Sequence, residues 1–325
     1  MSNSSKTPRA YCRRDFCAIS LRSGAGLLGV GLLSASSVQA AKPAKPAPTP
    51  KPYRPVRNWP EKGVPKVQTR GLGADTKGRL YVAGDSKHPI ILIAPDGKYL
   101  GCWGKGVLQG PHGVRVHKDT VWVTDVSTHQ AHQFTLKGKL LRSFGKKNQP
   151  GPAADQFNKP TDFAFGPDGA IYISDGYVNT RVVCLAPDGS VRKIWGRKGS
   201  GPGQFSLVHA IAIDRSGRVY VADRNNNRVQ IFDLKGKFLT EWKQLGKPYG
   251  LHACADGSIF FCGVEPDSGK FSVKKLNAKG KLLAEFGSTG KGPGQFLMAH
   301  SIHACPDGAM IVADGKANRL QKFST

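Results

Sequence analysis

Three histidines occupy positions that would let them bind one metal ion. His112, His209 and His300 are almost evenly spaced along the chain, and each precedes an apolar, strand-like run. Three neutral imidazoles that leave a fourth coordination position open form the ligand set of a catalytic zinc site. The alternative is that they are unrelated polar residues of a channel. The other histidines are interpreted as surface or supporting residues: His88, His117, His129, His132, His252 and His303.

The elements that must position these histidines come from an internal repeat. Segment 163–175 (FAFGPDGAIYISD) recurs at 211–223 as IAIDRSGRVYVAD, and variants begin near Gly71, Val114, Leu251 and Ile302. Each unit adds another apolar run and a Gly-containing turn, and most units end on an aromatic residue. Six units of about 43 residues, each with four strand patterns, are typical of propeller blades. We predict an all-β fold, a six-bladed β-propeller of NHL-type repeats.

The two ends of the repeat array predict how the ring closes. The sixth unit stops at Phe323 without an outer strand, and residues 56–59 (VRNW) have the pattern of the missing strand. We therefore predict a propeller domain over residues 56–325, closed by its N-terminal strand.

The histidines fall at one equivalent position of alternate units. We name it the mouth position, because the innermost strand of a blade begins there, at one mouth of the channel. Alternate blades of a sixfold ring lie about 120° apart, so three imidazoles would point at one axial spot. From the first unit to the sixth, the mouth positions hold Arg70, His112, Thr161, His209, Tyr249 and His300.

Two residues in the loops expected at the same mouth have no counterpart in the other units. Arg224 could hold a carboxylate through two hydrogen bonds, and Tyr177 could transfer a proton if a nearby cation lowered its pKa. A role in a solvent-exposed loop is the alternative for each. By contrast, one aspartate recurs in four units, which is typical of a structural turn residue: Asp125, Asp175, Asp223 and Asp314.

From the second unit onward the sequence resembles the peptidyl-α-hydroxyglycine α-amidating lyase family. The motifs that carry the resemblance, in the family's order, are Pro111-His112-Gly113, Val123-Thr124-Asp125-Val126, His129-Gln130, Pro160-Thr161-Asp162, Ser174-Asp175-Gly176-Tyr177, Val208-His209, Ala222-Asp223-Arg224 and Met298-Ala299-His300.

The resemblance implies a zinc-dependent reaction that cleaves the C–N bond of a hemiaminal to an amide and glyoxylate. Zinc would acidify the substrate hydroxyl as a Lewis acid. Tyr177 would act as the base and Arg224 would orient the substrate carboxylate. Met298 would line the substrate pocket, where we also expect Tyr249 and Thr161. The implied zinc ligands are His112, His209 and His300.

Departures from the family pattern accompany these matches. A second family arginine aligns with Ala83, and Arg70 is our candidate to replace it. The acid that follows the third histidine in the family is Ser301 here, which argues against a structural calcium ion. The family's disulfide positions align with residues other than cysteine: Asn158, Val178, Tyr220 and Ile231.

Residues 1–40 have the features of an export signal. Arg13-Arg14-Asp15-Phe16 precedes a weakly apolar run, and Val38-Gln39-Ala40 supplies the small residues of a cleavage site. Paired arginines resemble the twin-arginine signal of proteins exported in the folded state. We predict a twin-arginine-like signal peptide over 1–40, an Ala/Lys/Pro-rich linker over 41–55, and a periplasmic or extracellular protein. A basic N-terminus before a chance apolar run is the alternative.

Charge and cysteine content narrow the range of partners. The formal net charge is +26, with basic residues interspersed along the chain, which fits a solvated basic surface, an anionic envelope polymer or a carboxylate substrate. Predicted export makes a nucleic-acid partner a poor fit, and no later apolar run is long enough to span a membrane. The five cysteines beyond residue 40 are not spaced like metal ligands. The sequence leaves open whether two of them form a disulfide.

Three functions are compatible with these features. We favour an exported zinc-dependent lyase that acts on a small molecule or a peptide terminus. The main alternative is a non-catalytic NHL propeller that binds a protein or an anionic glycan in the cell envelope. A lactonase-type hydrolase fits less well, because lactonase propellers bind metal through carboxylates and Asn.

Overall fold

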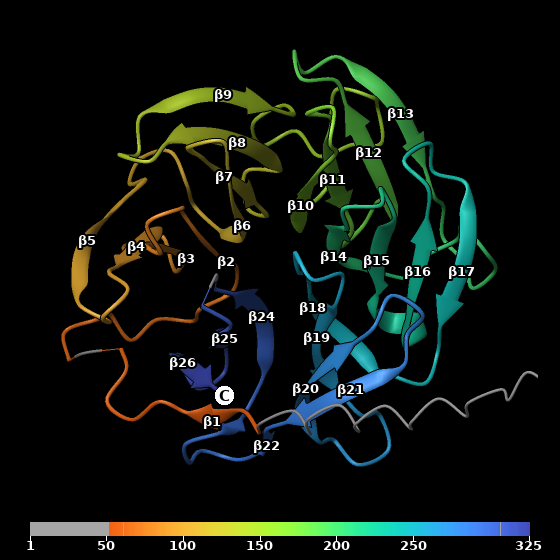
Figure 1. Cartoon of the computed structure of the whole chain (residues 1–325). Helices are drawn as coiled ribbons and strands as arrows, with labels where there is room; N and C mark the ends of the chain where they lie inside the picture. The colour runs from red at the N-terminus through yellow and green to blue at the C-terminus, as the bar shows by residue number, and fades with distance from the viewer. Residues whose placement is uncertain (1–51, 61, 306) are drawn as a thin grey trace, which may run out of the picture. The chain divides into compact units, whose positions relative to one another are not determined.

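The computed structural model describes residues 52–60, 62–305 and 307–325. Within these residues the strands form six four-stranded antiparallel sheets and one two-stranded sheet. The six sheets stand radially around a central channel, with β2, β6, β10, β14, β18 and β24 innermost (Figure 1). The predicted all-β, six-bladed propeller is confirmed. The signal peptide predicted for 1–40, and the predicted linker up to residue 51, lie outside the described residues.

The first three blades run outward from the channel in chain order. Blade one consists of β2 (Leu72–Ala74), β3 (Leu80–Ala83), β4 (Ile90–Ile93) and β5 (Tyr99–Trp103). Blade two consists of β6 (Pro111–His117), β7 (Thr120–Asp125), β8 (Gln130–Thr135) and β9 (Leu140–Phe144). Blade three consists of β10 (Asp162–Phe165), β11 (Ile171–Asp175), β12 (Arg181–Leu185) and β13 (Val191–Trp195).

Blades four and five repeat this order, and blade six takes its outer strand from the other end of the chain. Blade four consists of β14 (Val208–Ile213), β15 (Val219–Asp223), β16 (Arg228–Phe232) and β17 (Phe238–Trp242). Blade five consists of β18 (Lys247–Ala253), β19 (Ile259–Val264), β20 (Phe271–Leu276) and β21 (Leu282–Phe286). Blade six consists of β24 (Ala299–Ala304), β25 (Met310–Asp314), β26 (Arg319–Ser324) and β1 (Arg54–Pro55).

The middle strands are largely buried because each blade packs between two neighbours. In blade four every residue of β15 and β16 is buried, whereas the outer strand β17 is partly exposed. Strands covered on both faces have continuous apolar sequences instead of an alternating pattern. This burial explains the apolar runs that define each repeat unit.

The aromatic residue that ends most units packs against a glycine turn of the next blade. Trp195, at the end of β13, lies against Gly236, where φ is 75° and an added Cβ would be 2.8 Å from the indole ring. A positive φ and so close a contact both favour glycine. The same pairing joins Trp103 to Gly138, Phe144 to Gly189, and Trp242 to Gly280.

Closure of the ring involves a shorter and earlier strand than the sequence predicts. Arg54 and Pro55 of β1 pair with Ser324 and Phe323 of β26, and the Val56 N–H donates to Lys322 O at 2.8 Å. The predicted strand, 56–59, is therefore wrong in position, and β1 begins inside the predicted linker. The chain turns away after Val56, and the Trp59 indole N–H instead donates to Pro95 O of blade one.

Short elements complete the described structure. The 3-10 helix η1 (Arg224–Asn226) follows β15, and β22 (Ser288–Thr289) pairs in parallel with β23 (Gln295–Phe296). Nowhere in the described residues does a helix reach the length and apolar character needed to cross a membrane. The cysteines of this part of the chain are unpaired: Cys102, Cys184, Cys254, Cys262 and Cys305.

Candidate functional site

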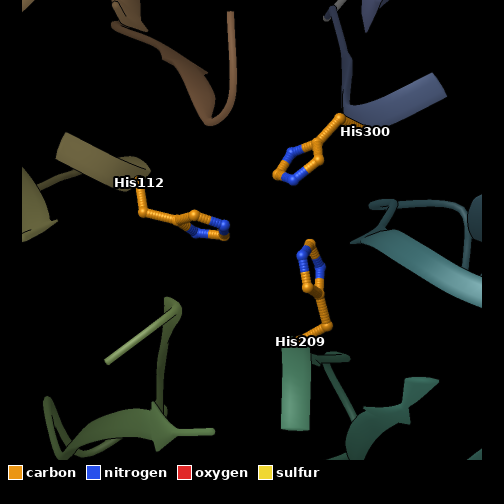
Figure 2. Close-up of side chains that lie close together, drawn as sticks. All are labelled: His112, His209 and His300. Carbon is orange, nitrogen blue, oxygen red and sulfur yellow. The ribbon is translucent and has the colours of Figure 1, made fainter. Parts of the chain in front are cut away.

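Three imidazoles meet at one mouth of the channel (Figure 2). His112, His209 and His300 lie in the innermost strands β6, β14 and β24 and are 2–6% exposed. Their ring centroids are 4.7–5.1 Å apart, and one nitrogen of each ring lies within 4.8 Å of the others. This is the convergence expected of mouth positions in alternate blades.

Backbone carbonyls of the intervening blades orient the three rings. His112 Nδ1 lies 2.8 Å from Thr161 O, His209 Nδ1 lies 2.6 Å from Tyr249 O, and His300 Nδ1 lies 3.2 Å from Arg70 O. A carbonyl oxygen can only accept a hydrogen bond, so each Nδ1 carries the proton. Each Nε2 therefore presents a lone pair, as metal-binding imidazoles do.

The recurrent aspartates hold the segments that lead into the histidine strands. Asp125 accepts hydrogen bonds from the Gln109 and Gly110 N–H groups, just before His112. In the same way Asp223 accepts from the Ser206 N–H, and Asp314 from the Leu297 and Met298 N–H groups. All three carboxylates are fully buried and bind backbone N–H groups, and Asp223 and Asp314 also pair with an arginine, which agrees with their predicted structural role.

The protonation state of the three imidazoles suits a metal ion. Burial lowers the pKa of His112 and His209 well below the ordinary value, and the pKa of His300 falls to about 4. Neighbouring imidazoles and the Arg224 guanidinium add to this effect at His209. At neutral pH all three rings are uncharged and can donate lone pairs. Nitrogen ligands of this kind fit zinc and other borderline divalent ions.

Tyr177 lies directly beside this cluster. Its hydroxyl is 3.0 Å from His112 Nε2 and 3.4 Å from His209 Nε2. Burial raises its pKa, whereas the charges of Arg224 and Arg70 act in the opposite direction. A phenol here can exchange a proton with a group bound at the three nitrogens.

Arg224, the first residue of η1, lies between two aromatic rings. Its guanidinium carbon is 5.6 Å from the centroid of the Tyr177 ring and 5.1 Å from that of Tyr249. Its Nε is buried and has no hydrogen-bond partner among the described residues. A buried, unpaired guanidinium N–H is costly, and a carboxylate ligand would satisfy it.

A cavity of about 620 Å³ lies at this mouth. It shares Arg70, His112, Tyr249 and His300 with a space of about 10 Å³ that all three imidazoles line, which is large enough for one ion or water molecule. Its described lining contains three cationic side chains and no carboxylate. The lining residues are Gln68, Arg70, His112, Val126, Ser127, His129, Lys159, Tyr177, Arg224, Tyr249, Met298 and His300.

The structure distinguishes among the other residues predicted for the pocket. Arg70, Tyr249 and Met298 line the cavity. Thr161 differs from expectation, because its fully buried hydroxyl donates to Val208 O and leaves only its carbonyl to serve the site. Gln68 and Lys159 were missed, since neither stands at a repeat position that predicts a direction for its side chain.

The position of Arg70 bears on the arginine that the family has at Ala83. The Arg70 N–H donates to Ala83 O at 3.1 Å, so the two residues are neighbours at the start of blade one. The Arg70 side chain lines the cavity, and its guanidinium also donates to the Gln68 side chain at 3.1 Å. A guanidinium therefore reaches the cavity from beside the position where the family arginine is absent.

Deeper in the channel a buried ion pair takes up the space below the imidazoles. Arg115 donates to both carboxylate oxygens of Asp162, at 3.0 and 2.6 Å, and to Leu251 O at 3.2 Å. A carboxylate and a carbonyl are oxygen ligands of the kind that calcium uses, and here they hold a guanidinium. Ser301 stands at the neighbouring position, and the lack of a structural calcium ion stays a prediction.

Comparison with known proteins identifies the family. A family model for the NHL repeat matches residues 205–232. A Caenorhabditis elegans protein named "Probable peptidyl-alpha-hydroxyglycine alpha-amidating lyase pgal-1" is 34% identical over 248 residues, covering 71% of this chain and 68% of that protein. The chain belongs to the peptidyl-α-hydroxyglycine α-amidating lyase family.

A larger relative matches by sequence, and a solved structure of low identity shares the fold. The mouse "Peptidyl-glycine alpha-amidating monooxygenase" is 32% identical over 276 residues, which cover 79% of this chain and 27% of the mouse protein. This lyase-family chain thus spans about a quarter of that relative. The structure of virginiamycin B lyase from Staphylococcus aureus has a TM-score of 0.56 at 19% identity, covering 80% of this chain and 82% of that one, and shares the fold.

Proposed function

We propose that this protein is an exported, zinc-dependent lyase that cleaves the C–N bond of an α-hydroxyglycine-type hemiaminal. The observation that carries the proposal is the convergence of three unprotonated Nε2 atoms with the Tyr177 hydroxyl at the base of a cationic cavity. Family membership supports the same reaction. Zinc held by His112, His209 and His300 would supply Lewis acidity to the substrate hydroxyl.

The reaction rearranges one proton and needs no added water. An N-acyl-α-hydroxyglycine loses the proton of its hydroxyl, forms a C=O bond at that carbon, and expels the nitrogen with the electron pair of the C–N bond. The nitrogen gains a proton, so the products are a primary amide and glyoxylate. A single acid–base group beside the hydroxyl can both accept and return the proton.

The cavity offers residues for each part of this task. Tyr177 accepts the hydroxyl proton and returns it to the leaving nitrogen. Arg224 and Arg70 bind the substrate carboxylate and hold the hydroxyl toward the imidazoles. Their positive charge also favours the phenolate form of Tyr177, because each opposes the effect of burial on its pKa. Tyr249 and Met298 supply the apolar part of the wall.

Metal content and glyoxylate release test the proposal together. We expect about one zinc per chain in the wild type, and its loss together with activity in His209→Ala. His88→Ala, outside the channel, is the matched control and should keep both. Absence of metal from wild-type protein purified without chelator would contradict the lyase and favour the non-catalytic NHL propeller, with a protein or anionic glycan as ligand. If the protein binds zinc but releases no glyoxylate from N-acyl-α-hydroxyglycines, the lyase reaction is contradicted, and the metal site serves a different reaction.

Export is a separate part of the proposal. The Arg13-Arg14 pair and the Val38-Gln39-Ala40 site support removal of residues 1–40 and a periplasmic or extracellular protein. The mass of the secreted chain should correspond to a new N-terminus at Ala41. Replacing both arginines with lysine should retain the protein in the cytoplasm. Retention of the full-length mass in the wild type would contradict this part alone.

A further inference from the structure

A fourth imidazole lines the cavity and has the opposite hydrogen-bond arrangement to the other three. His129 lies in the loop between β7 and β8 and shares the cavity with Tyr177 and Arg224. Its Nδ1 lies 3.2 Å from the backbone N–H of Lys159, at the start of the next blade. The sequence alone predicts no catalytic role for His129.

The partner of Nδ1 determines where the ring carries its proton. A backbone N–H can only donate, so His129 Nδ1 accepts and the proton of the neutral ring is on Nε2. His112, His209 and His300 have the reverse arrangement, because carbonyl oxygens fix the protons of their rings on Nδ1. Three rings therefore offer lone pairs, whereas His129 offers an N–H.

The backbone of one residue, Lys159, links His129 to the loop that carries Tyr177. The Lys159 N–H donates to His129, and the Lys159 carbonyl accepts from the Tyr177 N–H at 3.4 Å. His129 has a φ of 60°, and the residues that precede the third strand in blades three, four and six have similar values of 51–53°: Thr180, Asn227 and Asn318. The left-handed conformation of His129 is therefore a turn feature of the repeat, and it is the hydrogen bond to Lys159 that sets this imidazole apart.

We infer that the His129 Nε2–H donates a hydrogen bond to the acyl oxygen of the leaving amide. This inference rests on the proposed lyase function. As the C–N bond breaks, its electron pair passes to nitrogen and delocalises onto the acyl oxygen, where a fixed donor stabilises the developing charge. Tyr177 then returns the proton to nitrogen, so His129 stabilises charge without transferring a proton.

A neutral donor suits this cavity better than a charged one. Arg70, Lys159 and Arg224 already line it, and a fourth cation would be repelled by them. Burial, followed by the charge of Lys159, lowers the pKa of His129, so the ring is uncharged at neutral pH. A neutral imidazole N–H next to a carbonyl is an established way of stabilising an oxyanion.

Substitution of His129 tests the inference in the zinc-loaded, full-length mature protein. His129→Phe should lower kcat for N-benzoyl-α-hydroxyglycine about a hundredfold with zinc content and Tm unchanged. His129→Gln, which keeps an N–H donor, should recover much of the loss, and Ser127→Ala is a cavity-lining control. Across ring-substituted benzoyl substrates, kcat of the Phe variant should depend more steeply on leaving-group acidity. An unchanged kcat or an unchanged slope would overturn the inference.

A binding measurement separates failure of this inference from failure of the proposed reaction. β-Benzoylpropionate and γ-phenylbutyrate differ only by a carbonyl at the position of the acyl group, and neither can react. The wild type should bind the keto acid about tenfold more tightly, and His129→Phe should bind both equally. If the protein shows this binding pattern but no lyase activity, the proposed reaction is refuted and the role of His129 as a hydrogen-bond donor is kept. Equal binding of both acids by the wild type would refute the donor.

Discussion

Opposing electrostatic effects meet at the Tyr177 hydroxyl. Burial disfavours the phenolate, while Arg224 and Arg70 favour it, and the net pKa is raised. In the absence of another cation the residue is therefore a phenol at neutral pH. A divalent ion at the adjacent imidazoles would add a stronger positive charge within a few ångströms of the oxygen. The base required by the proposed reaction thus depends on the metal for its ionisation.

Tyr177→Phe should separate metal binding from proton transfer. The substitution removes the hydroxyl that lies 3.0 Å from His112 Nε2 but leaves all three imidazoles and their carbonyl partners. We expect zinc content to stay at the wild-type level and kcat to fall by about a hundredfold or more. Metal analysis and steady-state kinetics check this expectation, and a variant with full activity would exclude Tyr177 as the base.

Arg70→Gln should weaken substrate binding more than it slows chemistry. Loss of one charged hydrogen-bond donor to the carboxylate costs about 1.5–3 kcal/mol, which corresponds to a rise in KM of about tenfold to a hundredfold. Lys159→Met, which removes another cation of the same cavity, is the control for a general loss of charge. Equal effects of the two substitutions on KM would show that Arg70 has no specific contact.

At the scale of strands, an ion pair between an arginine and a buried aspartate anchors each of three blades. Arg228 of β16 donates to Asp223 at 2.8 Å and to the carbonyls of Ser200, Gly201 and Gln204. Arg181–Asp175 and Arg319–Asp314 repeat the ion pair in blades three and six. The arginine thereby ties the third strand of the blade to the segment that leads into its first strand.

Arg228→Met should destabilise the protein strongly. The substitution leaves the Asp223 carboxylate buried without its charge partner, which costs about 3–5 kcal/mol of the free energy of unfolding. The matched control is Arg192→Met, whose ion pair with Asp168 is about half exposed and should contribute little to the free energy of unfolding. Urea unfolding of the two variants measures the difference. Similar losses would show that burial of the pair is unimportant.

The sequence predicts elements better than their ends. The Asp-Gly and Lys-Gly turns and the apolar runs indicate six four-stranded blades, because turns and burial are local properties of the repeat. The closing strand is placed two residues too late, since its pairing with β26 depends on a partner more than 250 positions away. A two-residue strand has too little pattern to fix its own register.

The candidate site is predictable to the extent that it follows the repeat. The positions of His112, His209 and His300 follow from equivalent places in alternate units, whereas the tautomers of their rings depend on backbone carbonyls that a sequence does not show. The roles proposed for Tyr177 and Arg224 rest first on the observation that the other repeat units have different residues at the equivalent positions. Lys159 and Gln68 give no such signal, because their side chains reach the cavity from irregular loops.

For the molecule as a whole, buried histidines should make the metal-free protein sensitive to acid. His132 is 2% exposed, and burial lowers its pKa to about 4. Between about pH 6.5 and pH 4 the unfolded chain takes up a proton that the folded protein does not. The free energy of unfolding therefore decreases as the pH is lowered through this range. His132 alone should account for about 2 kcal/mol between pH 7 and pH 5. Urea unfolding with chelator present, compared with His132→Gln, measures this contribution.

Every blade contributes to the cluster of three histidines. It supplies either an imidazole or the backbone carbonyl that orients one. The contact between His300 and Arg70 joins the last blade to the first. A chain that lacks its final repeat therefore lacks a ligand and leaves Arg70 O without its partner, so the complete site arises only when synthesis and folding are finished. If the protein crosses the membrane already folded, the ion it carries is selected by the metal supply of the cytoplasm.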